Sequence, residues 1–342
     1  MATVEARPGR LERVEGAVAL REIEAARARI MARIATTPLR PSASLSRKTG
    51  HPVHLKLETQ QTTGSFKLRG AVNALLCLPE QDRAKGLVTA STGNHGRAVA
   101  YAAREVAVHA VVCMSALVPS NKVEAVRALG AEIRIIGGSQ DEAQIEVDRL
   151  VREQGLIEIP PFDHPDVIAG QGTIGLEIAE ALPDVESALV PLSGGGLAAG
   201  VAAAIKALRP KTRVIGISMA RGAAMHASLA AGRPVEVGEV ETLADSLGGG
   251  VGLANRYTFR MCRELLDHVA LLDEEEIAAG IRHAFEVEGE TVEGAGAVAI
   301  AALLFDKVRL RGPSVALLSG RNIEAELHRD IVAGRWPRKA VA

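Results

Sequence analysis

Lys67 is the residue whose setting most suggests chemistry. It lies between Phe66 and Leu68, shortly after Gly64, at the point where a helical pattern begins. The positive end of a helix dipole disfavours an ammonium group, and apolar neighbours add a desolvation penalty, so both effects lower the pKa of the amine. A lysine with a lowered pKa can act as a nucleophile that forms Schiff bases. The plain alternative is a solvated lysine whose stem packs along Phe66.

A glycine-rich turn is the second candidate. The segment "VPLSGGGLAAG" (190–200) reads as a strand, a glycine turn and the start of a helix. Such a turn lets backbone N–H groups approach an anion, and the helix dipole favours negative charge, so it can hold a phosphate. A dinucleotide would need an acidic residue at the end of the next strand, where this chain has Ser218, and no P-loop pattern occurs. A small phosphorylated cofactor remains possible, as does a tight turn without a ligand.

Two further strand-to-helix turns carry hydroxyl and amide side chains. The first, "STGNHG" (91–96), adds the backbone donors of a helix N-terminus to these side chains, and such a site can hold a carboxylate. Ordinary helix capping explains the same residues, and His95 alone would suit a structural role. The second turn, "LLSGRN" (317–322), can equally be a plain cap formed by Ser319 or Asn322.

The rest of the chain supplies the strands and helices that these turns need. Short apolar strands alternate with helical segments from about residue 53 to 160 and again from about 168 to 330, which is typical of right-handed βαβ units. Of the 342 residues, 47% are hydrophobic but only 2% aromatic, and 34 are glycine, a composition that suits a parallel sheet covered by helices. We expect an α/β fold with two doubly wound open-sheet domains and a ligand at the carboxyl ends of the strands.

A proline-rich segment marks the best domain boundary. The three prolines of "IPPFDHP" (159–165) break both the strand and the helix periodicity. We expect a discontinuous large domain that binds the cofactor, formed by residues 1–85 and 160–342, and a small domain inserted in it, formed by residues 86–159.

The bulk properties argue against several classes of partner. Forty basic and 41 acidic residues give a formal net charge of -1, which suggests neither nucleic acid nor a charged membrane surface as a partner. No apolar run approaches the ~18 residues of a membrane span, and charges throughout the N-terminal segment are unlike a signal peptide. The three cysteines are far apart and read as reduced thiols. We expect a cytoplasmic protein.

A poised lysine, a phosphate-binding turn and a carboxylate-binding turn are the parts that a pyridoxal phosphate enzyme acting on amino acids needs. Five segments make this interpretation specific: "TTGSFKLRGA", "TASTGNHGRA", "VIAGQGTIGLEI", "PLSGGGLAAG" and "LLSGRN". In type and order they resemble the fold-type II pyridoxal phosphate enzymes, which are tryptophan synthase β-like, and within them the serine/threonine dehydratase and serine racemase group. The resemblance covers about residues 37–322. It implies pyridoxal 5'-phosphate as cofactor, a small amino-acid substrate and a homodimer.

The resemblance also implies roles for the matching residues. Lys67 would hold the cofactor as a Schiff base and then move the Cα proton of the substrate. The other cofactor contacts would be Phe66 beside the ring, Asn94 at the ring hydroxyl, the backbone of Gly194, Gly195, Gly196 and Leu197 at the phosphate, and Ser319 at the pyridine nitrogen. A neutral serine there suits β-elimination over transamination. The substrate carboxylate would be bound by Ser91, Thr92, Gly93 and His95.

Four departures from the family's common residues bear on the reaction. Thr92 stands where racemases of this group have a serine that acts as a second acid/base, so Thr92 is a catalytic candidate only if its hydroxyl can substitute. Ser218 and Ala224 stand where some relatives have acids that bind a divalent cation, so we expect no metal site. Arg321 replaces a glycine and could meet an acidic or acyl group of a larger substrate, or be a solvated surface arginine. A proline is replaced by Gly294.

These variant stretches most resemble the dehydratases assigned to hydroxyectoine utilisation. The resemblance therefore implies a dehydratase and ammonia-lyase that removes water by β-elimination from a β-hydroxy amino acid, here a hydroxylated diaminobutyrate derivative. An ordinary L-threonine or L-serine ammonia-lyase and a serine racemase-like enzyme are alternatives within the family. An NAD-dependent oxidoreductase and a catalytically silent ligand-binding relative are alternatives of a different class.

Overall fold

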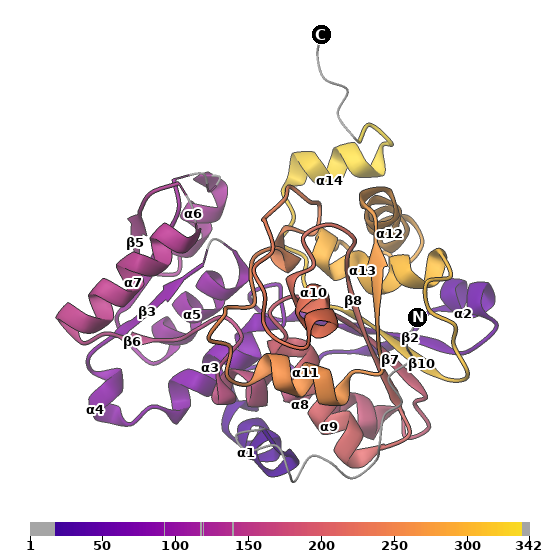
Figure 1. Cartoon of the computed structure of the whole chain (residues 1–342), viewed down its shortest axis with the longest axis horizontal. Helices are drawn as coiled ribbons and strands as arrows, with labels where there is room; N and C mark the ends of the chain where they lie inside the picture. Colours follow the sequence, from indigo (N-terminus) through magenta and orange to yellow (C-terminus); the bar gives the residue numbers. More distant parts are fainter. Residues whose placement is uncertain (1–17, 92, 117, 119, 139, 337–342) are drawn as a thin grey trace.

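The computed structural model describes residues 18–91, 93–116, 118, 120–138 and 140–336. Two β-sheets with helices on both of their faces form the body of the molecule (Figure 1). The fold is α/β, as the alternating strand and helix patterns predict. Within the described ranges, no helix is both long enough and apolar enough to cross a membrane.

Six strands form the larger sheet: β1 (Leu39–Pro41), β2 (Val53–Leu57), β7 (Ser187–Pro191), β8 (Arg213–Met219), β9 (His268–Leu272) and β10 (Ser314–Leu318). Their order is β1-β2-β10-β7-β8-β9, and every neighbouring pair is parallel except β1 with β2. Every residue of β7 and β10 is buried. Continuous burial of this kind is expected of parallel strands that are covered on both faces.

Helices cover both faces of the larger sheet. One layer contains α2 (Ala43–Thr49), α12 (Glu274–Glu286), α13 (Gly294–Leu304) and α14 (Ala325–Val332). The other contains α1 (Leu20–Ile30), α8 (Pro165–Ala181), α9 (Gly196–Leu208), α10 (Ala224–Ala231) and α11 (Thr258–Leu265). Ala316 and Leu318 of β10 belong to the first core, whereas Val315 and Leu317 belong to the second. Because successive side chains of a strand point to opposite faces, one strand holds both layers together.

Four strands form the smaller sheet, which Figure 1 shows on the left: β3 (Leu87–Ala90), β4 (Ala110–Met114), β5 (Glu132–Ile135) and β6 (Ile157–Glu158). All are parallel, in the order β5-β4-β3-β6. On one face Val88 and Val111 share a core with α7 (Gln140–Gln154). On the other face lie α3 (Lys67–Cys77), α5 (Asn94–Glu105) and α6 (Ser120–Arg127). These strands lie within 86–159, but the division of the chain into domains stays a prediction.

The sequence patterns did not indicate every element, and β1 and α13 are two of those that they missed. β1 is a short antiparallel edge strand that ends in Pro41, and proline is tolerated at an edge because its nitrogen has no hydrogen to donate to the ladder. The helix α13 is apolar along its whole length, and ten of its eleven residues are buried. A helix buried on all sides lacks the polar face that produces a 3.6-residue pattern.

The three turns singled out in the sequence follow the carboxyl ends of strands in both sheets. The glycine turn joins β7 to α9, and Ser319 follows β10, so both belong to the larger sheet. The turn at 91–96 joins β3 to α5 of the smaller sheet. A site built from all three must therefore lie where the two sheets face each other.

Candidate active site

A pocket of about 500 Å³ lies where these turns meet. It is lined by all eight residues that the sequence predicts at the cofactor: Phe66, Lys67, Asn94, Gly194, Gly195, Gly196, Leu197 and Ser319. Phe162, Ser246 and Glu293 are among its other lining residues. The fold thus brings the predicted residues together, while the contact of each with a cofactor stays a prediction.

Lys67 is the first residue of α3 and is half-buried in the wall of this pocket. Its Nζ atom donates a hydrogen bond to the carbonyl oxygen of Pro161 at 2.7 Å and lies 5.4 Å from the centre of the Phe66 ring. Burial lowers the pKa of the Lys67 amine to about 8, although the negative charge of Glu293 acts in the opposite direction. The amine is therefore much closer to its nucleophilic, neutral form at physiological pH than an exposed lysine is.

The glycine turn presents backbone donors to the same pocket. Gly195 has a φ of +92°, a left-handed conformation that only glycine adopts readily. A Cβ atom on Gly194 would lie 2.5 Å from the ring of Phe162. Among the described residues, the N–H groups of Gly194 and Gly195 have no acceptor, and no side chain caps α9. Free N–H groups at the positive end of a helix form a phosphate site.

Ser319 is tied directly to the start of α3. Its carbonyl oxygen accepts a hydrogen bond from the Phe66 N–H at 3.0 Å, and Gly320 forms an isolated bridge with Ser65. The Ser319 hydroxyl is buried and donates to the carbonyl oxygen of Ala295 at 3.3 Å. Its lone pairs remain available to a ligand atom in the pocket.

Asn94 is held by two residues from the far end of the chain. Its Nδ2 donates to Oε1 of Glu293 at 2.7 Å, and its Oδ1 accepts from Nδ2 of Asn322 at 2.5 Å. The N–H of Asn322 donates to Oε2 of Glu293 at 3.2 Å. A carboxamide nitrogen carries two hydrogens, so Asn94 keeps one donor for a ligand while its orientation is fixed.

Glu293 is a site residue that the sequence analysis did not find. It precedes α13 at the N-cap position but makes no side-chain cap there, and its carboxyl group instead lies buried in the pocket wall. Burial and the charge of Asp245 raise the pKa of Glu293 to about 7. The only local signal in the sequence is a glutamate beside the start of a helix. Such a glutamate is ordinarily explained by the favourable interaction of its negative charge with the helix dipole.

The predicted carboxylate turn is only partly inside the pockets. Gly93 lines a second pocket, of about 310 Å³, that adjoins the first. Ser91 accepts a hydrogen bond from the Gly93 N–H at 3.4 Å but lines neither of the two pockets, and the same is true of His95. The ring of His95 is buried and bonds the Ile159 carbonyl oxygen through Nε2 at 2.8 Å. Burial lowers the pKa of His95 to about 3, so the ring is neutral. Thr92 lies outside the described residues.

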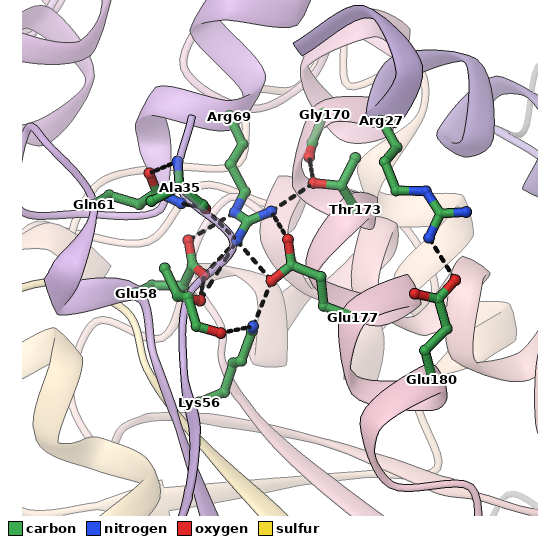
Figure 2. Close-up of polar contacts among 11 residues, drawn as sticks. Arg27, Ala35, Lys56, Glu58, Gln61, Arg69, Gly170, Thr173, Glu177 and Glu180 are labelled. Carbon is green, nitrogen blue, oxygen red and sulfur yellow. Dashed lines mark hydrogen bonds and ion pairs between the residues drawn. The ribbon is translucent and has the colours of Figure 1, made fainter. Parts of the chain in front are cut away.

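A buried ionic network fixes the helix that carries Lys67 (Figure 2). Arg69 of α3 bonds both carboxyl oxygens of Glu58 at 2.8 Å and bonds Glu177 of α8 at 2.6 and 3.0 Å. Lys56 of β2 also pairs with Glu177. Burial would raise the pKa of Glu58, but the Arg69 guanidinium holds it below its usual value. Two cations and two carboxylates thus balance in a largely buried space, and α3 is held to α8 and to the residue that follows β2.

The residues around the first pocket fit pyridoxal phosphate. An amine with a lowered pKa can hold the aldehyde, the free N–H groups before α9 can hold the phosphate, and the Ser319 hydroxyl can meet a ring atom. Among the described residues no group of three or more His, Cys, Asp or Glu side chains could hold a metal ion.

Several known proteins are similar to this chain in sequence and in fold. The family described as "Pyridoxal-phosphate dependent enzyme" matches residues 30–320. A Sinorhizobium fredii protein with the provisional name threonine dehydratase is 62% identical over 93% of this chain and 96% of its own length. The L-threonine ammonia-lyase of Geobacter sulfurreducens is 43% identical over 89% of this chain and 75% of its own length. The structure of maize serine racemase matches with a TM-score of 0.87 and 31% identity, covering 93% of this chain and 98% of that one.

These likenesses decide between the classes of function that the turns alone leave open. The matched family uses pyridoxal phosphate, so the cofactor of this chain is pyridoxal phosphate rather than a nicotinamide dinucleotide. The Sinorhizobium fredii and Geobacter sulfurreducens proteins match this chain over 96% and 75% of their own lengths. The chain therefore belongs to the fold-type II pyridoxal phosphate-dependent enzymes and is, within them, a lyase of the threonine dehydratase family.

Proposed function

We propose that the protein is an ammonia-lyase that removes water from a β-hydroxy α-amino acid and then releases ammonia. One observation carries this proposal: Lys67, with its lowered pKa, and the glycine turn, with its free N–H groups, line the same pocket. The names of the relatives, threonine dehydratase and L-threonine ammonia-lyase, support a reaction of this class.

Each residue of the pocket has a task in this proposal. Bound pyridoxal phosphate supplies an electron sink that stabilises negative charge on the substrate Cα atom. Lys67 anchors the cofactor and moves the Cα proton, and Phe66 packs beside the ring. Gly194, Gly195, Gly196 and Leu197 bind the phosphate, Asn94 the ring hydroxyl and Ser319 the ring nitrogen. Ser91, Thr92, Gly93 and His95 bind the substrate carboxylate, and Thr92 is the candidate for a second acid/base.

For the substrate we propose a hydroxylated diaminobutyrate derivative of the kind that opened hydroxyectoine would yield. The second pocket, which adjoins the first and shares Asn94, Ser246 and Glu293 with it, supports a substrate longer than threonine. L-Threonine and L-serine are the alternative substrates, and the names of the relatives support them.

The proposed reaction is tested by ammonia release from L-threonine, L-serine and a β-hydroxylated, Nγ-acylated diaminobutyrate. We expect release from at least one of them, and Lys67→Ala should lose about 10²- to 10⁴-fold in rate or more, because both anchoring and proton transfer are removed. Lys85→Ala is the matched control, since Lys85 is an exposed lysine paired with Asp82 on the surface. Full turnover by the Lys67 variant would refute the assignment.

A serine racemase-like activity is the second candidate, and the likeness to maize serine racemase favours it. Racemisation would need an acid/base on each face of the substrate, and the second one would have to be Thr92. Chiral chromatography after incubation with L-serine separates the two activities: a lyase yields ammonia and a 2-oxo acid, whereas a racemase yields D-serine.

We also propose that the enzyme is a cytoplasmic homodimer with the discontinuous large domain and the inserted small domain given above. The family resemblance supports the dimer, and the free thiols of Cys77, Cys113 and Cys262 support a reducing compartment. Light scattering should then give a mass about twice the 35.9 kDa of one chain.

A further inference from the structure

We propose that the second pocket binds the far end of the substrate side chain, and that Arg97 binds an acceptor oxygen there. The substrate class is then a β-hydroxy α-amino acid whose side chain ends in a carbonyl or carboxylate oxygen a few bonds beyond Cβ. This inference rests on the proposed lyase function and deepens it.

The second pocket continues the first. Its lining consists of Gly93, Asn94, Arg97, Lys122, Val126, Ser246, Glu293 and Asn322, of which Asn94, Ser246 and Glu293 also line the first pocket. A substrate reacting beside Lys67 can therefore extend its side chain past Asn94 and Glu293.

The geometry of α5 places Arg97 next to the predicted carboxylate turn. The N–H of Arg97 donates to the carbonyl oxygen of Gly93 at 3.2 Å, which is the first helical hydrogen bond of α5. Residues three and four apart on a helix lie on one face, with Cβ atoms about 5–6 Å apart, so Gly93, Asn94 and Arg97 face the same space. A substrate whose carboxylate is held at this turn therefore has Arg97 within reach of a side chain of moderate length.

Arg97 is charged, half-buried and held in place. Its Nη1 donates to Oδ1 of Asn322 at 2.7 Å, and Nδ2 of Asn322 donates in turn to Asn94 and to the carbonyl oxygen of Thr63. In the part of the chain that the structure describes, no carboxylate lies within ion-pair distance of Arg97. A guanidinium has five donors, so several remain for a ligand. A positioned cation without a carboxylate in a half-buried pocket is suited to an acceptor oxygen.

The other charged groups of the second pocket do not cancel that of Arg97. Lys122 is paired with Asp245 at 2.9 Å. Glu293 is the remaining acid, and burial raises its pKa to about 7, so a large share of it is protonated at neutral pH. Burial lowers the pKa of Arg97 while Glu293 opposes this shift, but the guanidinium stays charged. Arg321, which the sequence analysis considered for this role, is exposed and lines neither pocket.

The test measures equilibrium binding to the holoenzyme, from the change in its visible absorbance, for three amino acids that lack a β-hydroxyl group. L-2-Aminobutyrate is the short probe, and Nγ-acetyl-L-2,4-diaminobutyrate and L-glutamate are the long probes that end in an amide and a carboxylate oxygen. We expect the long probe that matches the natural substrate to bind more tightly than L-2-aminobutyrate. In Arg97→Gln this preference should fall about 10- to 100-fold, because hydrogen bonds to a charged group are lost.

Two more variants make the result specific. Lysine keeps the charge of arginine but not its planar fork of donors. In Arg97→Lys, the preference for L-glutamate over L-2-aminobutyrate should therefore be retained better than the preference for the acetylated probe over L-2-aminobutyrate. Arg321→Gln, which changes an exposed arginine outside both pockets, should leave the ratio of affinities as it is in the wild type.

Failure of this inference can be told apart from failure of the proposed function. If L-threonine or L-serine releases ammonia, but no long probe is preferred or Arg97→Gln leaves the preference intact, the inference is overturned and the lyase stands. If no amino acid changes the absorbance and none releases ammonia, both are overturned.

Discussion

Two titratable side chains, the half-buried Lys67 and the buried Glu293, bear on the chemistry of the pocket near neutral pH. Burial lowers the pKa of Lys67 to about 8 and raises that of Glu293 to about 7, so each is driven toward its neutral form. An amine and a carboxyl group in one pocket, both with pKa values near neutral pH, can exchange protons with a substrate at a small cost in free energy. Glu293 also orients Asn94, because its carboxyl group accepts a hydrogen bond from the Asn94 side chain. The charge of Glu293 therefore affects the hydrogen bond that Asn94 is predicted to form with the ring hydroxyl of the cofactor.

The first residue-level prediction concerns the pH dependence of cofactor capture by the apoenzyme. The neutral amine is the reactive form, so the rate should rise with pH and level off above about 8 instead of near the ordinary 10.5. At pH 7 about one tenth of the amine is then neutral, which is about 300-fold more than for an unperturbed lysine. Stopped-flow absorbance after mixing apoenzyme with pyridoxal phosphate measures this rate.

Glu293→Gln provides the control for that profile. Because the negative charge of Glu293 raises the pKa of Lys67, its removal should lower that pKa and move the midpoint of the rate profile to lower pH. A wild-type midpoint near 10.5, or a shift of the variant to higher pH, would contradict the electrostatic account of the pocket.

Some of the site residues could be predicted from the sequence because their signals are local. Lys67 stands at a helix start between apolar residues, and the three glycines of 194–196 stand together between a strand and a helix. Glu293 and Arg97 gave no such signal, since their places in the pocket walls depend on contacts with Asn94 and Asn322 that span 199 and 225 residues of chain. Only the packing of the two sheets makes these contacts.

The helix α3 depends on long-range charge pairing more than on its own sequence. It has no side-chain cap at its N-terminus, and its first turn contains the wholly buried Arg69. We expect Arg69→Met to lower the free energy of unfolding by about 3–5 kcal/mol, because the fully buried Glu58 and the largely buried Glu177 would each lose a partner. Urea denaturation followed by circular dichroism measures the change.

The neighbouring Arg27–Glu180 pair is the matched control for this prediction, and Figure 2 shows both. The side chains of Arg27 and Glu180 are 41% and 57% exposed, so Arg27→Met should cost less than about 1 kcal/mol. Adding Glu58→Gln to Arg69→Met should recover part of the loss, since one buried charge is removed. Equal costs for Arg69→Met and Arg27→Met would show that the buried network does not hold α3.

Several strands and helices were read from apolar runs and the turns between them, whereas α13 and β1 were not. The strands β7 and β10 and the helices that follow the turns read directly from the chain, because apolar runs are separated there by glycine and serine. The helix α13 reads "GAGAVAIAALL", with no polar face, so its small buried residues leave no amphipathic pattern. The edge strand β1 is too short for alternation to show.

In the whole molecule, the candidate active site lies between the two sheets. Among the described residues, four contacts between side chains join segments that follow strands of the smaller sheet to segments of the larger one: Asn94 with Glu293, Asn94 with Asn322, Arg97 with Asn322, and Lys122 with Asp245. The proposed cofactor site draws its phosphate donors from the larger sheet and Asn94 from the smaller one. The relative placement of the sheets, fixed by folding, therefore completes a site that neither sheet contains alone.

The central claim is that the amine of Lys67 carries the cofactor of a lyase. The most direct measurement is borohydride reduction of the purified holoenzyme, followed by proteolysis and mass spectrometry of the peptides. We expect one phosphopyridoxyl group per chain, on the peptide that contains Lys67, together with loss of ammonia-lyase activity. A reduced adduct on another lysine, or an unmodified Lys67 in an enzyme inactivated by the treatment, would contradict the account.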